Sequence, residues 1–177
     1  MKNHGISNGL IAGLVGIVLY LGYYFINPDL LFNFWLGFIV GLAVWIYFMR
    51  KAGMDTKADN GGFLTFKEGL KPTFLTFVVG SLLTVLFSYV LFNMIDPSLN
   101  DLMKEKSLEM AEKMSSMFGA SEEAVEAMRE QMEEQDMSMS IGRLVQQYLI
   151  GLIFPGFILA LIISAVIKKK PAENEVV

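Results

Sequence analysis

The sequence predicts an all-α fold, an integral membrane four-helix bundle with an extracytoplasmic amphipathic helical hairpin between spans three and four. Three observations lead to this prediction. Of the 177 residues, 54% are hydrophobic and only 18% are charged, whereas a soluble domain has about 25% charged residues. Four apolar stretches are long enough to cross a hydrocarbon core, which takes roughly 20 helical residues. The segment from 96 to 147 instead alternates polar and apolar residues at helical spacing.

The four predicted spans contain no Asp, Glu, Lys, Arg or His. They cover residues 6–26, 30–49, 72–95 and 148–167. A proton relay or an activated nucleophile inside the bilayer needs an ionisable group, so the protein is predicted not to be an enzyme. The chain also has no cysteine and one histidine, His4, which excludes a thiolate site and a histidine cluster for zinc.

The distribution of basic residues predicts the orientation of the spans. The turn at residues 27–29 has no basic residue, whereas the loop between spans two and three and the carboxyl tail have Arg50, Lys51, Lys57, Lys67, Lys71 and Lys168 to Lys170. By the positive-inside rule, both termini and the central loop are cytoplasmic. The expected location is the bacterial inner membrane, with the lipid bilayer as a partner. No extended basic patch supports nucleic-acid binding.

Residues 96–147 are predicted to form two antiparallel helices that stand on the outer surface. Asp96-Pro97 favours a helix start, Gly119 a helix end and Ser121 a second start. The segment has five basic and twelve acidic residues, so the hairpin is acidic. Apolar residues recur at helical spacing, at Leu99, Met103, Met110, Met114 and Met117 and again at Val125, Met128 and Met132.

Methionine is the unusual residue of this segment, which contains eight of the twelve in the chain. Two short helices bury only one face of each other, so apolar surface should remain for the membrane surface, a second copy or another protein. The predicted partner-binding residues are Met110, Met114, Met117, Met128 and Met132. Met137-Ser138-Met139 brings two thioethers close together, which also suits Cu(I). Copper stays an open alternative, and no cofactor is predicted.

Small residues predict where the spans approach closely. Gly9-xxx-Gly13 and Gly37-xxx-Gly41 place two glycines on one helix face, where backbones pack without side chains between them. Packing within the monomer is the favoured interpretation, and a dimer interface is the alternative. Pro155, followed by Gly156, should kink the fourth span because proline removes a backbone hydrogen bond.

The loop before the third span has its own helix signal. Thr65 and Glu68 fit the capping box, in which each side chain binds the backbone N–H of the other residue. This spacing predicts a short interfacial turn, after which Pro72 opens the third span.

Several short motifs carry a family resemblance. They are Asn60-Gly61-Gly62-Phe63-Leu64-Thr65-Phe66, Phe118-Gly119-Ala120-Ser121, Pro155-Gly156 and the basic run from Lys168 to Lys170. On these motifs the chain resembles, over nearly all of its length, the uncharacterised bacterial membrane family called domain of unknown function 4199. The resemblance implies a four-helix inner-membrane protein and transfers no catalytic residue.

Two functions fit these observations. The first is a non-enzymatic accessory or assembly protein that binds a protein partner, or a second copy, through its acidic outer hairpin. The second is a small oligomeric transporter or channel for a neutral solute. A transporter needs a polar path that solvent reaches between the spans, whereas an accessory protein should show packed spans and an apolar patch on the hairpin.

Overall fold

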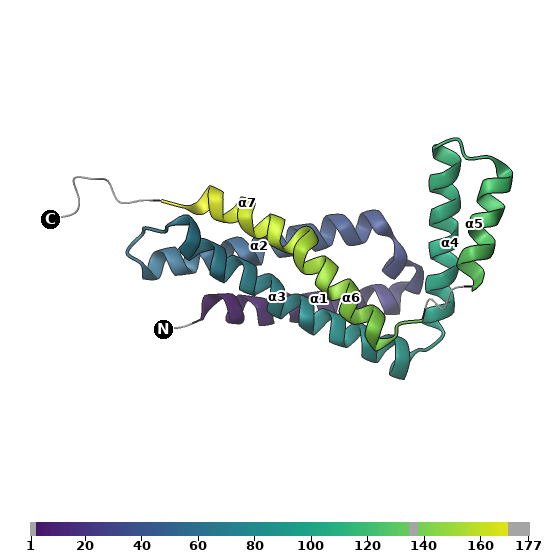
Figure 1. Cartoon of the computed structure of the whole chain (residues 1–177). Coiled ribbons are helices and arrows are strands. Elements are labelled where there is room, and N and C mark those ends of the chain that lie inside the picture. Colours follow the sequence, from purple (N-terminus) through teal and green to yellow (C-terminus); the bar gives the residue numbers. More distant parts are fainter. Residues whose placement is uncertain (1–2, 135–137, 170–177) are drawn as a thin grey trace.

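The described part of the chain is built from helices. The computed structural model describes residues 3–134 and 138–169, and no named strand occurs among them (Figure 1). In chain order the elements are α1 (His4–Ile26), η1 (Pro28–Phe32), α2 (Phe34–Asp59), α3 (Phe66–Val90), η2 (Leu91–Ile95), α4 (Leu99–Met117), α5 (Glu122–Glu134), α6 (Ile141–Gly151), η3 (Leu152–Phe157) and α7 (Ile158–Ile167).

Four helical segments are long and apolar enough to cross a membrane, as the sequence predicts. They are His4–Ile26, Phe34–Asp59, Phe66–Ile95 and Ile141–Ile167. The second starts later than residue 30, because residues 28–32 form the separate helix η1 and the Asn33 side chain accepts a hydrogen bond from the Leu36 N–H at 3.0 Å. It also continues past Met49 to Asp59. The helices are therefore longer than their uncharged stretches.

The third span differs from the prediction at its start. Thr65 and Glu68 form the expected capping box, but the helix that they start is α3 itself, which continues through Pro72. The expectation that Pro72 opens the span is therefore wrong. Proline at this interior position removes one backbone donor, yet the helix continues through it without a break.

The fourth span is interrupted near its middle. Phe154, the residue before Pro155, has the non-helical angles φ −121° and ψ 117°, and Leu152–Phe157 forms a π-helical segment between α6 and α7. The span begins at Ile141 rather than at residue 148, because the Ser140 side chain caps α6 through the Arg143 N–H at 3.3 Å. The segment before the span thus joins it directly.

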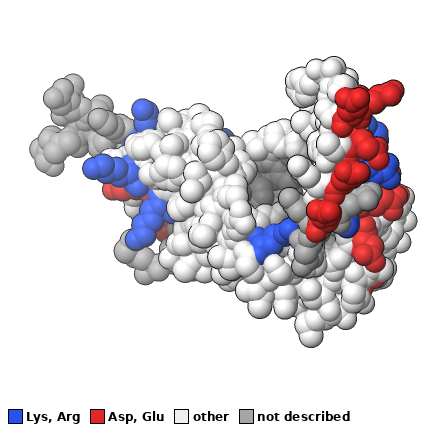
Figure 2. All heavy atoms as spheres, turned by 45° about the vertical axis from the view of Figure 1, so that its right-hand side comes forward, with Lys and Arg blue, Asp and Glu red and all other residues white. Residues whose placement is uncertain are grey.

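The charged residues lie at the two ends of the bundle. The start of α1, the connection from α2 to α3 and the end of α7 share one end, here called the basic end after Lys57, Lys67, Lys71, Lys168 and Lys169 (Figure 1). Helices α4 and α5 lie at the opposite end, here called the hairpin end. Acidic side chains gather over these two helices, and the surface between the ends is almost free of charge (Figure 2). This is the charge pattern of a membrane-crossing bundle.

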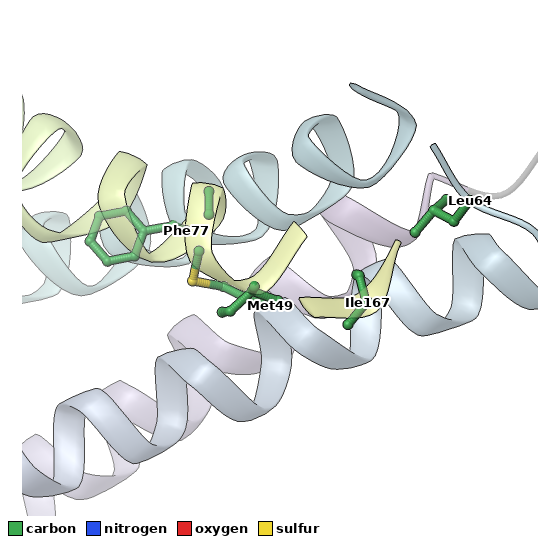
Figure 3. Packing of buried hydrophobic residues seen from close by; sticks show 6 residues of the cluster. Met49, Leu64, Phe77 and Ile167 are labelled. Carbon is green, nitrogen blue, oxygen red and sulfur yellow. The ribbon is translucent and has the colours of Figure 1, made fainter. Parts of the chain in front are cut away.

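Two clusters of buried residues hold the bundle together. One lies toward the basic end and joins α2, α3 and α7 through Met49, Leu64, Phe77, Ala160, Ile163 and Ile167 (Figure 3). The other lies at the hairpin end and contains Leu91, Phe92, Leu99, Met139 and Leu144. The second cluster includes the first residue of α4, so the hairpin is anchored in the same packing as the spans.

The glycines of α1 lie directly against α3. A Cβ atom built on Gly9 would lie 2.8 Å from the Thr76 carbonyl oxygen, and one built on Gly13 would lie 2.9 Å from the Gly80 carbonyl oxygen. Real Cβ atoms do not approach backbone oxygens so closely, so these positions require glycine. Gly80 reciprocates, because its Cβ would lie 2.7 Å from the Gly9 carbonyl oxygen. The two backbones are in contact along this line.

The prediction of close packing at Gly37 and Gly41 is wrong for the described part of the chain. A Cβ atom at either position would meet no heavy atom within 4 Å. Both glycines instead line a cavity of about 160 Å³ between α1 and α2, together with Ala12, Gly16 and Trp45. Gly156 is packed tightly, because a Cβ on it would overlap the Phe77 ring.

Candidate functional site

The hairpin formed by α4 and α5 is a polar feature outside the spans. Helices α4 and α5 run antiparallel and lie crosswise to the spans rather than standing in line with them (Figure 1). Gly119 ends α4 with a positive φ of 75°, a conformation that favours glycine, and the Ser121 Oγ accepts the Ala124 N–H at 3.3 Å to start α5. These are the residues that predicted the turn between the two helices.

Asn100 holds the base of the hairpin in place. Its Nδ2 donates to the Phe92 carbonyl oxygen at 2.8 Å, and its Oδ1 accepts the Met139 N–H at 2.9 Å. Asn93 adds a second link, since its Nδ2 donates to the Met139 carbonyl oxygen at 3.0 Å. The Asn100 side chain thus joins the end of the third span, the start of α4 and the chain that leads into α6.

Lys106 connects α4 to the bundle. Its Nζ lies 3.2 Å from Glu109 Oε1 and 3.9 Å from Oδ1 of Asp29 in η1. The hydrogen bond to Glu109 raises the pKa of Lys106, and the charge of Asp29 acts in the same direction. Below the first residues of α4, hydrogen bonds from Ser98 lower the pKa of the Asp96 carboxyl. Lys106, which lies between Met103 and Met110 on the apolar stripe of α4, is therefore paired where the helix meets the bundle.

The predicted methionine surface separates into two parts. Met128 and Met132 are half-buried, and the Ser115 hydroxyl of α4 donates to the Met128 Sδ at 3.5 Å. Met128 belongs to the contact between the two helices, and Met132 follows it four residues later on the same face of α5. Met110, Met114 and Met117 are exposed. Met139 is buried in the cluster at the hairpin end, and Met137 lies outside the described residues, so the Met137-Ser138-Met139 pair has no described geometry.

An acidic face covers the other side of α5. Glu123, Glu126, Glu130 and Glu134 recur every three or four residues and are exposed. Arg129 lies toward α4 instead, with its Nη1 3.5 Å from Glu112 Oε1. Charged and apolar residues are therefore segregated on the hairpin, as in an amphipathic unit.

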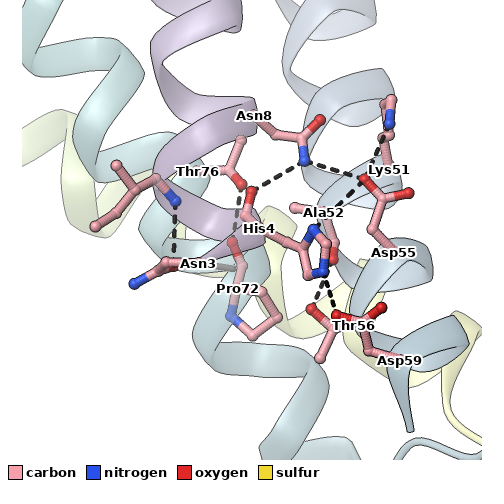
Figure 4. A network of polar contacts seen from close by, with 11 residues as sticks. Asn3, His4, Asn8, Lys51, Ala52, Asp55, Thr56, Asp59, Pro72 and Thr76 are labelled. Atoms are coloured by element: carbon pink, nitrogen blue, oxygen red, sulfur yellow. Dashed lines mark hydrogen bonds and ion pairs between the residues drawn. The ribbon is translucent and has the colours of Figure 1, made fainter. Parts of the chain in front are cut away.

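A polar network at the basic end was not predicted from the sequence (Figure 4). Asp55 Oδ2 accepts hydrogen bonds from Lys51 Nζ at 2.9 Å and from Asn8 Nδ2 at 3.3 Å. His4 Nε2 lies 2.7 Å from Asp59 Oδ2. Lys51, Asp55 and Asp59 are spaced by four residues on α2, as are His4 and Asn8 on α1, and this spacing is the signal that could have indicated one shared face.

This network joins two helices next to an open cavity. The cavity has a volume of about 550 Å³ and is lined by His4, Asp59, Lys67 and Lys71 among others. Its walls have charges of both signs, and the described residues hold no group of three His, Cys, Asp or Glu side chains that suits a metal ion. We assign the network to fixing the start of α1 against the end of α2.

The hydroxyl groups of α3 do not form a path through the bundle. Thr76, Ser81, Thr84 and Ser88 each donate to the carbonyl oxygen four residues earlier in their own helix, at 2.6 to 3.0 Å. Thr73 and Ser164 are fully buried, and their hydroxyl oxygens lie 3.0 Å apart between α3 and α7. Hydroxyls that satisfy backbone groups of their own helix are typical packing features of membrane helices.

The fold and the charge pattern together define a class: a multi-pass membrane protein with a polar helical hairpin at one end of its bundle. Comparison with protein families then identifies the chain further. It belongs to the family described as a protein of unknown function, DUF4199, whose sequence model matches residues 7–169. The resemblance found in the sequence motifs is thus confirmed. No curated protein and no solved structure matches the chain.

Proposed function

We propose that the protein is a non-enzymatic accessory or assembly protein of the bacterial inner membrane that binds a protein partner through its hairpin. In this proposal both termini are cytoplasmic and the hairpin end is outside. The basic residues at the opposite end support this orientation through the positive-inside rule. The observation that carries the proposal is the acidic face of α5, which is exposed and presented on a hairpin whose base is fixed to the spans by Asn100.

The transporter hypothesis has less support from the same geometry. The hydroxyl groups of α3 are used by the backbone of their own helix, and α1 and α3 are in backbone contact at Gly9, Gly13 and Gly80. The cavity between α1 and α2 is small and mainly apolar in its lining. Catalysis in the membrane also has little basis, because the four predicted spans contain no Asp, Glu, Lys, Arg or His side chain.

Crosslinking followed by capture in mild detergent tests the proposal. The acidic-face variant combines Glu123→Gln, Glu126→Gln, Glu130→Gln and Glu134→Gln in the full chain. A matched control neutralises exposed acids elsewhere, with Asp101→Asn, Glu105→Gln and Glu122→Gln. We expect one identified protein to crosslink to the wild type and to the control, and its yield to fall at least about tenfold in the acidic-face variant, which corresponds to roughly 1.4 kcal/mol of binding free energy.

Deletion of the hairpin gives the complementary test. Residues 98–139 are replaced by a short flexible linker, and the variant is expressed in the null strain under conditions in which that strain fails to grow. The proposal predicts that the variant fails to restore growth although it is inserted in the membrane. Full restoration would assign the function to the spans and favour the transporter hypothesis.

A further inference from the structure

One face of α4 packs against the bundle at the start of the helix and is exposed toward the end of the helix. Leu99 is buried in the cluster at the hairpin end, Met103 packs against that cluster, and Lys106 lies 3.9 Å from Asp29. These three residues follow each other at spacings of four and three, so they share the face of α4 that is turned toward the end of the bundle.

The same face then carries the exposed methionines. Met110, Met114 and Met117 continue the spacing of three or four residues, and a helix that repeats every 3.6 residues turns them in the direction of Lys106. Beyond the edge of the bundle, no element of the described part of the chain buries these methionines. The exposed fraction rises from 40% at Met110 and 52% at Met114 to 85% at Met117 and 84% at Phe118. These apolar side chains are therefore more exposed toward the tip of the hairpin.

Helix α5 lies on a different side of α4. The contacts between them use Ser115, which binds Met128, and Glu112, which pairs with Arg129. By helical spacing, both α4 residues lie away from the methionine face. By helical spacing, the acidic face of α5 lies on the side of α5 away from Met128, and Figure 2 shows acidic side chains gathered on the hairpin. The order from the bundle outward is thus methionine face, α4, α5 and acidic face.

The neighbouring part of the bundle marks the level of a membrane interface. Helix α4 contacts η1, and the helix that follows η1 begins with the exposed aromatic residues Phe34, Trp35 and Phe38. Exposed tryptophan and other aromatic residues at the end of a span are typical of the boundary between lipid headgroups and acyl chains. The crosswise hairpin lies at this end of the bundle (Figure 1).

We propose that the methionine face of α4, with Phe118 at the tip, lies in the lipid headgroup and acyl boundary of the leaflet at the hairpin end. Lys113 is exposed on the same face and reaches the phosphate groups, while the acidic residues of α5 stay in water. The surface of the bilayer, rather than a protein, covers Met110, Met114 and Met117. The inference rests on the proposed function only in taking the bundle to cross a bilayer, and it leaves the acidic face of α5 for a protein partner.

Site-specific fluorescence tests the inference, and the chain is suited to it because it contains no cysteine. Met117→Cys and Glu130→Cys are each labelled with an environment-sensitive dye and reconstituted, as the full chain, in vesicles of phosphatidylethanolamine and phosphatidylglycerol. Glu130→Cys is the matched control on the opposite face. Circular dichroism and unchanged detergent melting establish that both labelled proteins are folded.

The expected result is a blue-shifted emission from the label at 117 and loss of its intensity when acyl chains carry a nitroxide quencher. The label at 130 should instead be quenched by aqueous iodide. Equal quenching of both labels by iodide, with no effect of the lipid quencher, would overturn the inference. So would protection of the label at 117 from both quenchers, because that outcome shows a protein cover. The vesicles contain no partner, so a failure here is independent of the capture experiment.

Discussion

At each end of the bundle, one asparagine side chain joins neighbouring elements through hydrogen bonds. At the basic end, Asp55 receives hydrogen bonds from Lys51 and Asn8, and Asn8 is only 3% exposed. The Asn8 Nδ2 also donates to the His4 carbonyl oxygen at 2.9 Å, whereas its Oδ1 has no hydrogen-bond partner among the described residues. A buried amide of this kind is costly unless it is bonded, so Asp55 and the His4 carbonyl together retain it.

At the hairpin end, Asn100 has the corresponding role and allows a prediction. Asn100→Ala removes the donor to the Phe92 carbonyl and the acceptor of the Met139 N–H, which leaves two backbone groups without this partner. We expect a destabilisation of about 1–3 kcal/mol, concentrated in the hairpin. Hydrogen exchange measured by mass spectrometry on the protein in detergent should show faster exchange in residues 99–117, with the spans unchanged.

Asn93→Ala is the matched control for this experiment. Asn93 contributes a single bond to Met139, and its other bond is to the Tyr89 carbonyl oxygen of its own helix. Its effect on the hairpin should be smaller. Equal exchange in wild type and Asn100→Ala would show that apolar packing of Leu99 and Met139 alone fixes the hairpin.

At the scale of elements, α1 and α3 pack through their backbones, whereas α1 and α2 do not. The sequence contains the same small-xxx-small pattern in α1 and α2. Gly9 and Gly13 touch another helix, whereas a Cβ on Gly37 or Gly41 would meet no described atom within 4 Å. In a membrane the attraction between helices depends on close contact of atoms rather than on exclusion of water. Gly9-xxx-Gly13 should therefore tolerate a larger side chain less well than Gly37-xxx-Gly41.

Gly13→Leu is predicted to destabilise the bundle, and Gly41→Leu is its control. A side chain at 13 would collide with the Gly80 carbonyl oxygen and the Leu83 side chain, so the helices would have to separate. We expect a loss of about 1–3 kcal/mol or more, measured as a lower Tm in detergent. Leucine at 41 enters the cavity of about 160 Å³ and should leave the Tm nearly unchanged. A lower Tm for both variants would indicate that α2 also approaches a neighbour, such as a second copy.

At the scale of the whole molecule, charge divides the protein into a basic end, an uncharged middle and an acidic hairpin (Figure 2). This division predicts the topology in the membrane. Fusions of a reporter after Asp59, Gly119 and Val177 should report the cytoplasm, the outside and the cytoplasm, because basic residues near the ends of spans are retained inside. A cytoplasmic signal at Gly119 would contradict the proposed orientation, and with it the outer position of the hairpin.

The sequence by itself determined the number and order of the main helices, although not the residues at which three of the spans begin. Uncharged runs of about 20 residues identify the four spans, because every charge in the hydrocarbon region is costly. Local signals also identified the capping box at Thr65 and Glu68, the end of α4 at Gly119 and the break near Pro155. Each of these depends on a few neighbouring residues and on backbone chemistry, so it is readable without knowledge of the fold.

Only the tertiary structure decided which faces meet. Nothing in the sequence distinguishes Gly13, which touches α3, from Gly41, which borders a cavity, since helix packing depends on the rotation and tilt of both partners. The same holds for the methionines. Met128 of α5 contacts α4, whereas Met110, Met114 and Met117 of α4 lie on the face opposite α5, because Asn100 and Lys106 hold α4 in one rotation against the end of the bundle. Periodicity defines a stripe on a helix, and only contacts with other elements determine what that stripe faces.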